Sequence, residues 1–185
     1  KKEIDKDNRI FVLDSQNASG ALGLMVYFAS VLKNEGKEIL EIIDYLKRMA
    51  ERVYTVFILD NLKTLEAGGR IGKAKYLLGT ILNFKPVLML KNGLIEPFGS
   101  GKIMGTDYIV PTILKFLKEH YKGGEFIGGV AHNIVNTVNM RRFDQIKDEI
   151  KKFVKVNTFL IQKFGSTITS HIGLNSIGLS FFEKF

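Results

Sequence analysis

Residues 53–97 read VYTVFILDNLKTLEAGGRIGKAKYLLGTILNFKPVLMLKNGLIEP, and this stretch decides the fold class. It opens with β-branched, aromatic and aliphatic residues at 53–59, a composition that favours a buried strand. Asp60 follows as a predicted helix N-cap. A short helix is expected over 61–67, because two successive glycines come directly after it and glycine commonly ends a helix. A strand followed by a helix is therefore the first unit of the stretch.

The second half of the stretch predicts another helix and a β-hairpin. Residues 73–82 are expected to be helical. The apolar runs 86–90 and 94–97 flank Asn92-Gly93, and an Asn-Gly pair between two such runs is a strong local signal for a hairpin. Strands that alternate with helices and include a hairpin predict an α/β protein with a mixed sheet flanked by helices.

The residues after the hairpin continue this alternation. Their patterns predict a helix over 108–121, a strand over 126–131, a helix over 142–153 and a strand over 156–161. The final stretch, 166–182, alternates β-branched and aromatic residues around two glycines. We expect it to be extended and to close the sheet.

The N-terminal residues predict less than a whole domain. They hold one expected strand at 10–13, a helix at 21–32 that is apolar nearly all round, and an amphipathic helix at 39–49. One strand cannot form a sheet. We therefore expect residues 1–52 to be the C-terminal half of a first α/β domain and residues 53–185 to be a second domain. The apolar helix needs cover on most sides; without the missing half it would expose an apolar patch.

Composition narrows the class of protein further. The chain has 185 residues, 45 % of them hydrophobic, and no cysteine, which removes disulfides and thiol chemistry. Its longest apolar run, residues 21–32, is shorter than the roughly twenty residues of a membrane span. We expect a cytoplasmic protein. The net charge of +8 indicates either contact with anionic partners or simply a lysine-rich surface, and no arginine–aromatic stripe indicates a specific nucleic-acid site.

Known catalytic motifs are absent from the sequence. Gly72-Lys73 resembles the end of a phosphate-binding loop, but Ala67 and Ala74 stand where that loop needs a glycine and a serine or threonine. The three histidines show no metal-ligand spacing. These motifs therefore indicate no catalytic or metal site of a known type.

The unusual glycine and polar positions resemble those of one family, the DegV family of bacterial fatty-acid-binding proteins. The match runs from about Arg9 to Phe182, and its most specific part is the Gly-Gly-Arg-Ile segment followed by Lys-Pro. The matching segments are VLDS at 12–15, ASGA at 18–21, LEAGGRIGK at 65–73, LGTILNFKP at 78–86, NGLI at 92–95, TSHIG at 169–173 and GL at 178–179.

The resemblance implies a two-domain fold whose first domain is incomplete here, and a long-chain fatty acid bound in an apolar tunnel between the domains. It also implies a binding protein, not an enzyme, that presents this lipid to a fatty acid kinase for phospholipid synthesis. Transient contact with anionic membranes would suit the basic charge. His171 and Arg70 are the expected carboxylate ligands. Further residues are expected along the tunnel or near the head group: Ser170, Gly69, Ser19, Leu78, Ile81, Leu82 and Phe84.

Ordinary structural roles compete with these functional ones. His171 can be a hydrogen-bonded core histidine, and Arg70 can cap a glycine-terminated helix. Most of the tunnel residues can equally be ordinary core.

Three departures from the family pattern bear on the lipid site. Two upstream carboxylate-binding loops of the family do not occur in this sequence. Leu174-Asn175 replace the Pro-Gly that follows the terminal His-x-Gly, which is expected to change a turn close to His171. The arginine that follows the hairpin in the family has no counterpart near residues 102–104.

Two other functions remain open at the level of sequence. A phosphotransferase on the same scaffold would use Arg70, Lys73 and His171. A basic module associated with nucleic acid would use the lysines and would show steep salt dependence of binding.

Overall fold

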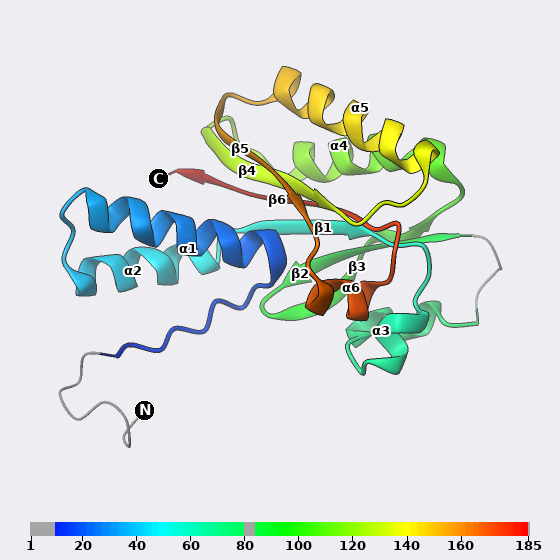
Figure 1. Ribbon diagram of the computed structural model, residues 1–185, viewed down its shortest axis with the longest axis horizontal. Helices are drawn as coiled ribbons and strands as arrows, with labels where there is room; N and C mark the ends of the chain where they lie inside the picture. The colour runs from blue at the N-terminus through cyan, green and yellow to red at the C-terminus, as the bar shows by residue number, and fades with distance from the viewer. Residues whose placement is uncertain (1–9, 80–83, 185) are drawn as a thin grey trace.

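The computed structural model describes residues 10–79 and 84–184, which fold around one mixed β-sheet (Figure 1). The elements in chain order are α1 (Ser19–Asn34), α2 (Ile39–Ala50), β1 (Tyr54–Ile58), α3 (Lys63–Ala67), the 3-10 helix η1 (Gly72–Leu77), β2 (Lys85–Lys91), β3 (Leu94–Ile103), the 3-10 helix η2 (Thr106–Tyr108), α4 (Ile109–His120), β4 (Glu125–His132), α5 (Thr137–Phe153), β5 (Val156–Lys163), α6 (Ser166–Ile172) and β6 (Ile177–Lys184).

The sheet has six strands in the order β3-β2-β1-β6-β4-β5. All neighbouring strands are antiparallel except β4 and β5, which are parallel and are joined through α5. A parallel pair needs such a crossover, whereas antiparallel strands can be joined by a tight turn. The α/β class with a mixed sheet flanked by helices is confirmed.

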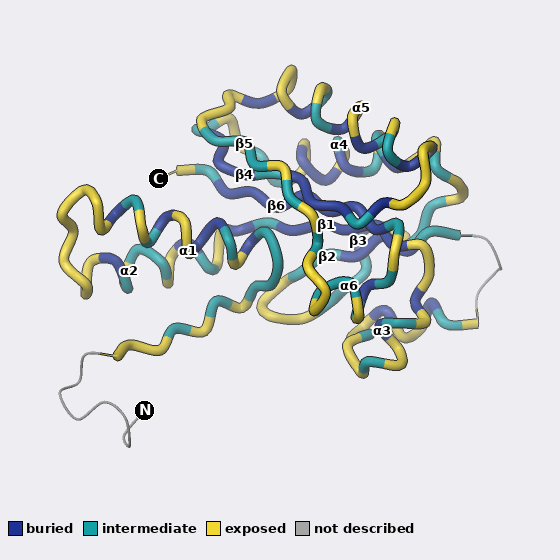
Figure 2. The backbone as a smooth tube through the Cα atoms, viewed as in Figure 1, coloured by how far each residue is buried: buried dark blue, intermediate teal, exposed yellow. Residues whose placement is uncertain are grey.

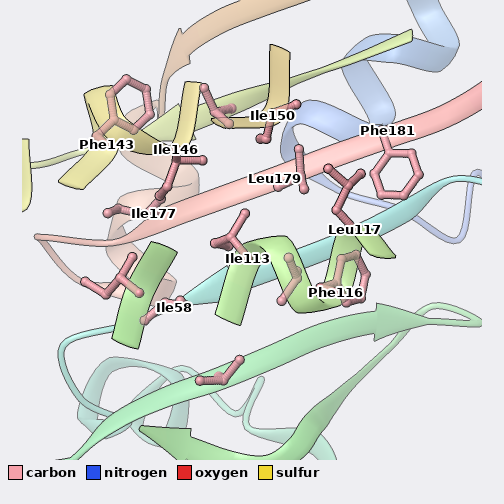
Figure 3. Packing of buried hydrophobic residues seen from close by; sticks show 14 of the residues in the cluster. Ile58, Ile113, Phe116, Leu117, Phe143, Ile146, Ile150, Ile177, Leu179 and Phe181 are labelled. Carbon is pink, nitrogen blue, oxygen red and sulfur yellow. The ribbon is translucent and has the colours of Figure 1, made fainter. Parts of the chain in front are cut away.

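One face of the sheet is covered by α4 and α5, which lie above it in Figure 1. Alternate residues of β6 point into this layer, as the two-residue period of a strand requires. Figure 3 shows Ile177, Leu179 and Phe181 of β6 facing the two helices. The helices contribute a row of fully buried side chains, namely Ile113, Phe116 and Leu117 from α4 and Phe143, Ile146 and Ile150 from α5. This layer is the main hydrophobic core.

The opposite face carries two separate apolar clusters. The first, the α1–α2 cluster, packs both helices against Ile127 of β4 and Phe182 of β6. The second, the α3–α6 cluster, packs α3, η1 and α6 against Phe57 of β1 and Leu88 of β2. The tube coloured by burial (Figure 2) shows the central strands buried beneath these elements. The space between the two clusters is where the functional site is found.

Helix α1 covers the sheet with one side only. Leu24 and Phe28 are buried on that side, but Leu22 is 42 % exposed and Val26 64 % exposed on the other. The prediction that other residues cover most sides of this helix is therefore wrong for this chain. The predicted exposed apolar patch is present on the outer side of α1. No described helix is both long and apolar enough to cross a membrane.

The hairpin prediction is confirmed in detail. Asn92 and Gly93 link β2 to β3 with φ angles of 50° and 75°. A two-residue hairpin turn with positive φ at both central positions has a twist that matches the flanking strands, and asparagine and glycine adopt positive φ most readily.

Two predicted features near the N-terminal half are corrected. Residues 10–13 form no strand and belong to no described sheet. Asp60 does not cap the next helix, which begins at Lys63 with Leu62 at the N-cap. Its carboxylate instead accepts a hydrogen bond from Lys85 Nζ at 2.5 Å.

Two predicted elements have different bounds or types. The helix expected over 73–82 is a 3-10 helix that ends at Leu77, and residues 80–83 lie outside the described residues. The first part of the expected C-terminal strand is helix α6. Ile168 and Ile172 are four residues apart, so a helix places both against the α3–α6 cluster. Tertiary burial thus overrides the β propensity of these residues.

Candidate functional site

A cavity of about 160 Å³ lies on the face of the sheet opposite α4 and α5. Its wall is formed by the start of α1 on one side and by α3 and α6 on the other, with the strands beneath. This volume is many times that needed for one water molecule. The cavity therefore occupies the space between the α1–α2 and α3–α6 clusters.

Small residues on the central strands make the floor. Gly129 and Ala131 of β4 and Gly178 and Ser180 of β6 all line the cavity. Large side chains at these alternating positions would fill the space that lies above the sheet. At Gly178 a Cβ would already come within 3.1 Å of Phe164 Cζ. The hollow thus follows from the small residues at these four positions.

The walls of the cavity are mainly aliphatic. Leu24 of α1, Leu65 of α3, Leu90 of β2, Leu160 of β5 and Ile168 of α6 contribute side chains. A cavity with such a lining favours an apolar ligand, because it removes hydrocarbon from water without providing many hydrogen-bond partners.

His171 and Arg70 both line this cavity, so the structure brings together the two residues expected to bind a carboxylate. His171 is on α6 rather than on a strand, and its Nδ1 is buried without a hydrogen-bond partner among the described residues. Arg70 follows α3; its guanidinium donates to the Gly68 carbonyl at 2.5 Å and remains exposed. An imidazole N–H and a guanidinium in the lining of one cavity can both donate hydrogen bonds to an anionic group.

A second polar group lies on the floor. Thr55 of β1 and Ser180 of β6 are directly opposite each other in the sheet, and their hydroxyl oxygens are 3.0 Å apart. Ser19 and Gly20, at the start of α1, also line the cavity, as does Gln162 of β5. The α1 N-terminus has no side-chain cap.

The remaining predicted site residues lie away from the lining. Ser170 is exposed and donates to the Thr167 carbonyl. Gly69 has a φ of 68° with open space around it. Leu78 and Phe84 are half-buried beside the α3–α6 cluster. Their roles remain predictions, and Ile81 and Leu82 fall outside the described residues.

The turn after α6, which contains Leu174 and Asn175, is held by side-chain hydrogen bonds of two asparagines. Asn175 has a φ of 58°, a conformation that asparagine adopts more readily than most residues. Its side-chain oxygen accepts hydrogen bonds from the backbone N–H of Val135 and the amide of Asn136, while Asn133 Nδ2 donates to the Gly173 carbonyl at 2.7 Å. These bonds fix the turn that follows His171.

Of the three residues proposed for phosphate chemistry, Lys73 does not line the cavity with Arg70 and His171. Lys73 forms an ion pair with Glu96 at 2.6 Å and does not line the cavity. The same contact lowers the pKa of the Glu96 carboxyl. Among the residues described, no group of three or more His, Asp or Glu side chains is placed to hold a metal ion.

Fold and cavity together define the class: an α/β protein with a six-stranded mixed sheet and an apolar ligand cavity on one face. Residues 1–184 match the family model described as "Uncharacterised protein, DegV family", and the chain belongs to this family.

Relatives and solved structures agree with this assignment. A DegV domain-containing protein of Staphylococcus aureus is 28 % identical over 181 residues, which cover 96 % of this chain and 62 % of that protein. A solved structure described as fatty acid binding of a DegV family protein from Thermus thermophilus has a TM-score of 0.87 at 28 % identity, over 96 % of this chain and 62 % of that one. The chain thus spans about three fifths of the length of these proteins.

A third structure is similar in fold alone. The Streptococcus pneumoniae Fatty Acid Kinase (Fak) B3 protein loaded with linoleic acid has a TM-score of 0.81 at 20 % identity and covers 98 % of this chain and 63 % of that one.

Proposed function

We propose that this chain binds a long-chain fatty acid, with the alkyl chain in the cavity and the carboxylate at His171 and Arg70. The observation that carries the proposal is a mainly aliphatic cavity whose lining includes both His171 and Arg70. Each methylene buried there contributes about 0.8 kcal/mol. The carboxylate would accept hydrogen bonds from the ring N–H and the guanidinium, which limits the cost of removing it from water.

The same proposal extends to what the protein does with the lipid. A carrier that encloses the alkyl chain and leaves the carboxylate near an exposed arginine can present that carboxylate to a second protein. The S. pneumoniae structure is described as a Fatty Acid Kinase (Fak) B3 protein loaded with linoleic acid. We therefore propose a fatty acid kinase as the partner, with this chain acting as a binding protein rather than as the enzyme.

A net charge of +8 supports brief contact with anionic membranes during loading. Because this attraction between exposed charges is screened by salt, the contact is expected to weaken as ionic strength rises.

A larger side chain on the cavity floor tests the proposal. Ala131→Leu would fill part of the cavity, and we expect uptake of oleate by delipidated protein to fall at least about tenfold, a change of roughly 1.4 kcal/mol. Because the added carbons enter existing space, the stability of the variant should fall by less than the 1–3 kcal/mol that is roughly typical of overpacking. Uptake is measured by mass spectrometry after extraction, and stability by urea unfolding.

Ala29→Leu is the matched control. Ala29 is half-buried beside the α1–α2 cluster and does not line the cavity, so this variant should bind oleate as the wild type does. Equal uptake by both variants would place the lipid elsewhere, and no uptake by the wild type would remove the proposed function.

A further inference from the structure

The floor of the cavity holds a hydroxyl pair that an ordinary alkyl chain does not need. Thr55 and Ser180 are only 6 % and 7 % exposed, and both line the cavity. They come from neighbouring antiparallel strands, β1 and β6, and stand directly opposite each other. Two buried hydroxyls therefore face a mainly aliphatic cavity from its floor.

The hydrogen bonds of this pair are incomplete. Each hydroxyl has one O–H donor and can accept from others, and the two oxygens are 3.0 Å apart. One O–H therefore donates to the other oxygen. Within the described residues neither hydroxyl has a further hydrogen-bond partner, so the second O–H is left without an acceptor.

The start of α1 packs closely against this pair. A Cβ at Gly20 would be 3.2 Å from Ser180 Oγ. Because glycine has no Cβ, α1 can lie this close to Ser180, and a larger residue at this position would crowd the hydroxyl. Thr55 and Ser180 still face the cavity, which both residues line.

The pair is separate from the His171–Arg70 wall. Along β1 and β6 it lies two residues from Phe57 and Gly178, roughly 7 Å at the rise of an antiparallel strand. Phe57 belongs to the α3–α6 cluster together with Ile172, the neighbour of His171. The cavity thus has one polar site near His171 and Arg70 and a second on its floor, with Phe57 and Gly178 between them.

A plain alkyl chain on this floor would leave the second O–H unpaired and away from water, which is unfavourable. An oxygen atom on the chain would accept that hydrogen bond. We propose that Thr55 and Ser180 recognise a hydroxyl group on the ligand, so that the favoured ligands are hydroxylated long-chain fatty acids. The proposal rests on the function proposed above and specifies its ligand class.

The test uses delipidated protein and an equimolar mixture of stearate and positional isomers of monohydroxystearate, with the bound lipid extracted and quantified by mass spectrometry. We expect at least one hydroxylated isomer to be enriched over stearate about tenfold, the discrimination expected from one hydrogen bond of roughly 1.4 kcal/mol. The double variant Thr55→Val/Ser180→Ala should lose this enrichment and bind stearate at least as well as the wild type.

The double variant removes both polar partners while nearly keeping their shape, a change that can be close to neutral in stability. Thr158→Val/Ser100→Ala is the matched control, because both residues lie outside the cavity lining, and it should retain the enrichment.

Four outcomes would overturn the inference. The wild type and the double variant could show the same ratio of hydroxylated to plain acid, which would make the pair irrelevant to selection. The double variant could fail to bind either acid, which would indicate that Thr55 and Ser180 bind the carboxylate. Binding of stearate alone by the wild type would retain the proposed function without this specificity, whereas binding of neither acid would remove the function itself.

Discussion

At the scale of single residues, two histidines show how burial gives the same side chain different roles. His132 is 7 % exposed, and its Nδ1 accepts the backbone N–H of Ile134 at 3.2 Å. Its ring lies 4.4 Å from that of Phe143. His171 Nδ1, in contrast, is buried without a partner. A histidine whose Nδ1 accepts a backbone N–H supports the fold, whereas His171 lines the cavity and is a residue that we propose to bind a carboxylate.

The pH dependence of stability should report on His132. Burial, followed by the positive charges of Lys163 and Lys147, lowers the pKa of His132 below its ordinary value of 6.5. The unfolded chain then binds the proton more readily than the folded one. This contribution to stability is fully present above about pH 6.5 and is lost as the pH falls through the folded-state pKa.

His132→Asn keeps a side-chain acceptor near the Nδ1 position but cannot titrate. We expect its free energy of unfolding to decline less steeply than that of the wild type as the pH falls below about 6.5, measured by urea unfolding at a series of pH values. The same exchange at His120, whose ring stacks on Phe116, controls for the loss of a packed ring. If the free energy of unfolding of wild type and His132→Asn changed with pH in parallel, His132 would not cause this pH dependence.

Sequence reasoning identified His171 and Arg70 because they stand in recognisable segments with unusual glycines. Thr55 and Ser180 gave no such signal. A threonine or serine inside an apolar strand is compatible with ordinary strand propensity. Whether the two meet depends on the register of β1 against β6, which pairs residues far apart in the chain.

At the scale of elements, the contact between α3 and α6 sets the position of His171. Gly68, at the end of α3, has an ordinary φ of −79°, whereas Gly69 has a φ of 68°. The two glycines therefore have different roles. Gly69 adopts the left-handed conformation that ends the helix, and Gly68 makes room for the ring, because a Cβ there would lie 2.9 Å from His171 Nδ1.

Gly68→Ala should therefore displace the His171 ring or separate α3 from α6. We expect a loss of roughly 1–3 kcal/mol, as for other overpacked contacts, together with a change in the imidazole resonances of His171 in NMR spectra. Gly23→Ala, within α1, is the control: its added methyl meets only Gln162 Nε2 at 4.0 Å, so it should gain about 0.5–1 kcal/mol from helix propensity. An unshifted His171 signal in a stable Gly68→Ala protein would show that this contact is unimportant.

The elements that sequence predicted best are those whose signals are local. The Asn92-Gly93 hairpin and the helical spacing of α4 need only their own residues. Residues 10–13 and α6 could not be assigned this way. A strand exists only with a neighbour to pair with, and α6 is helical because Ile168 and Ile172 are buried together against α3 and the sheet.

At the scale of the whole molecule, the arrangement of layers makes the site. The α4–α5 face forms a continuous core, while the opposite face is covered by two clusters that leave a cavity between them. The mixed sheet was predictable from the alternation of strands and helices. The order β3-β2-β1-β6-β4-β5 was not, because β1 pairs with the last strand of the chain and no local pattern specifies such a distant neighbour. The division into domains 1–52 and 53–185 remains a prediction.

The central claim is that this chain carries a long-chain fatty acid in its cavity. The most direct measurement is native mass spectrometry of the purified chain, before and after addition of oleate, with the released lipid identified under denaturing conditions. We expect a bound species with the mass of a long-chain fatty acid, about one per chain, that is displaced by added oleate and released on unfolding. A folded chain that shows only the polypeptide mass and takes up no oleate would contradict it.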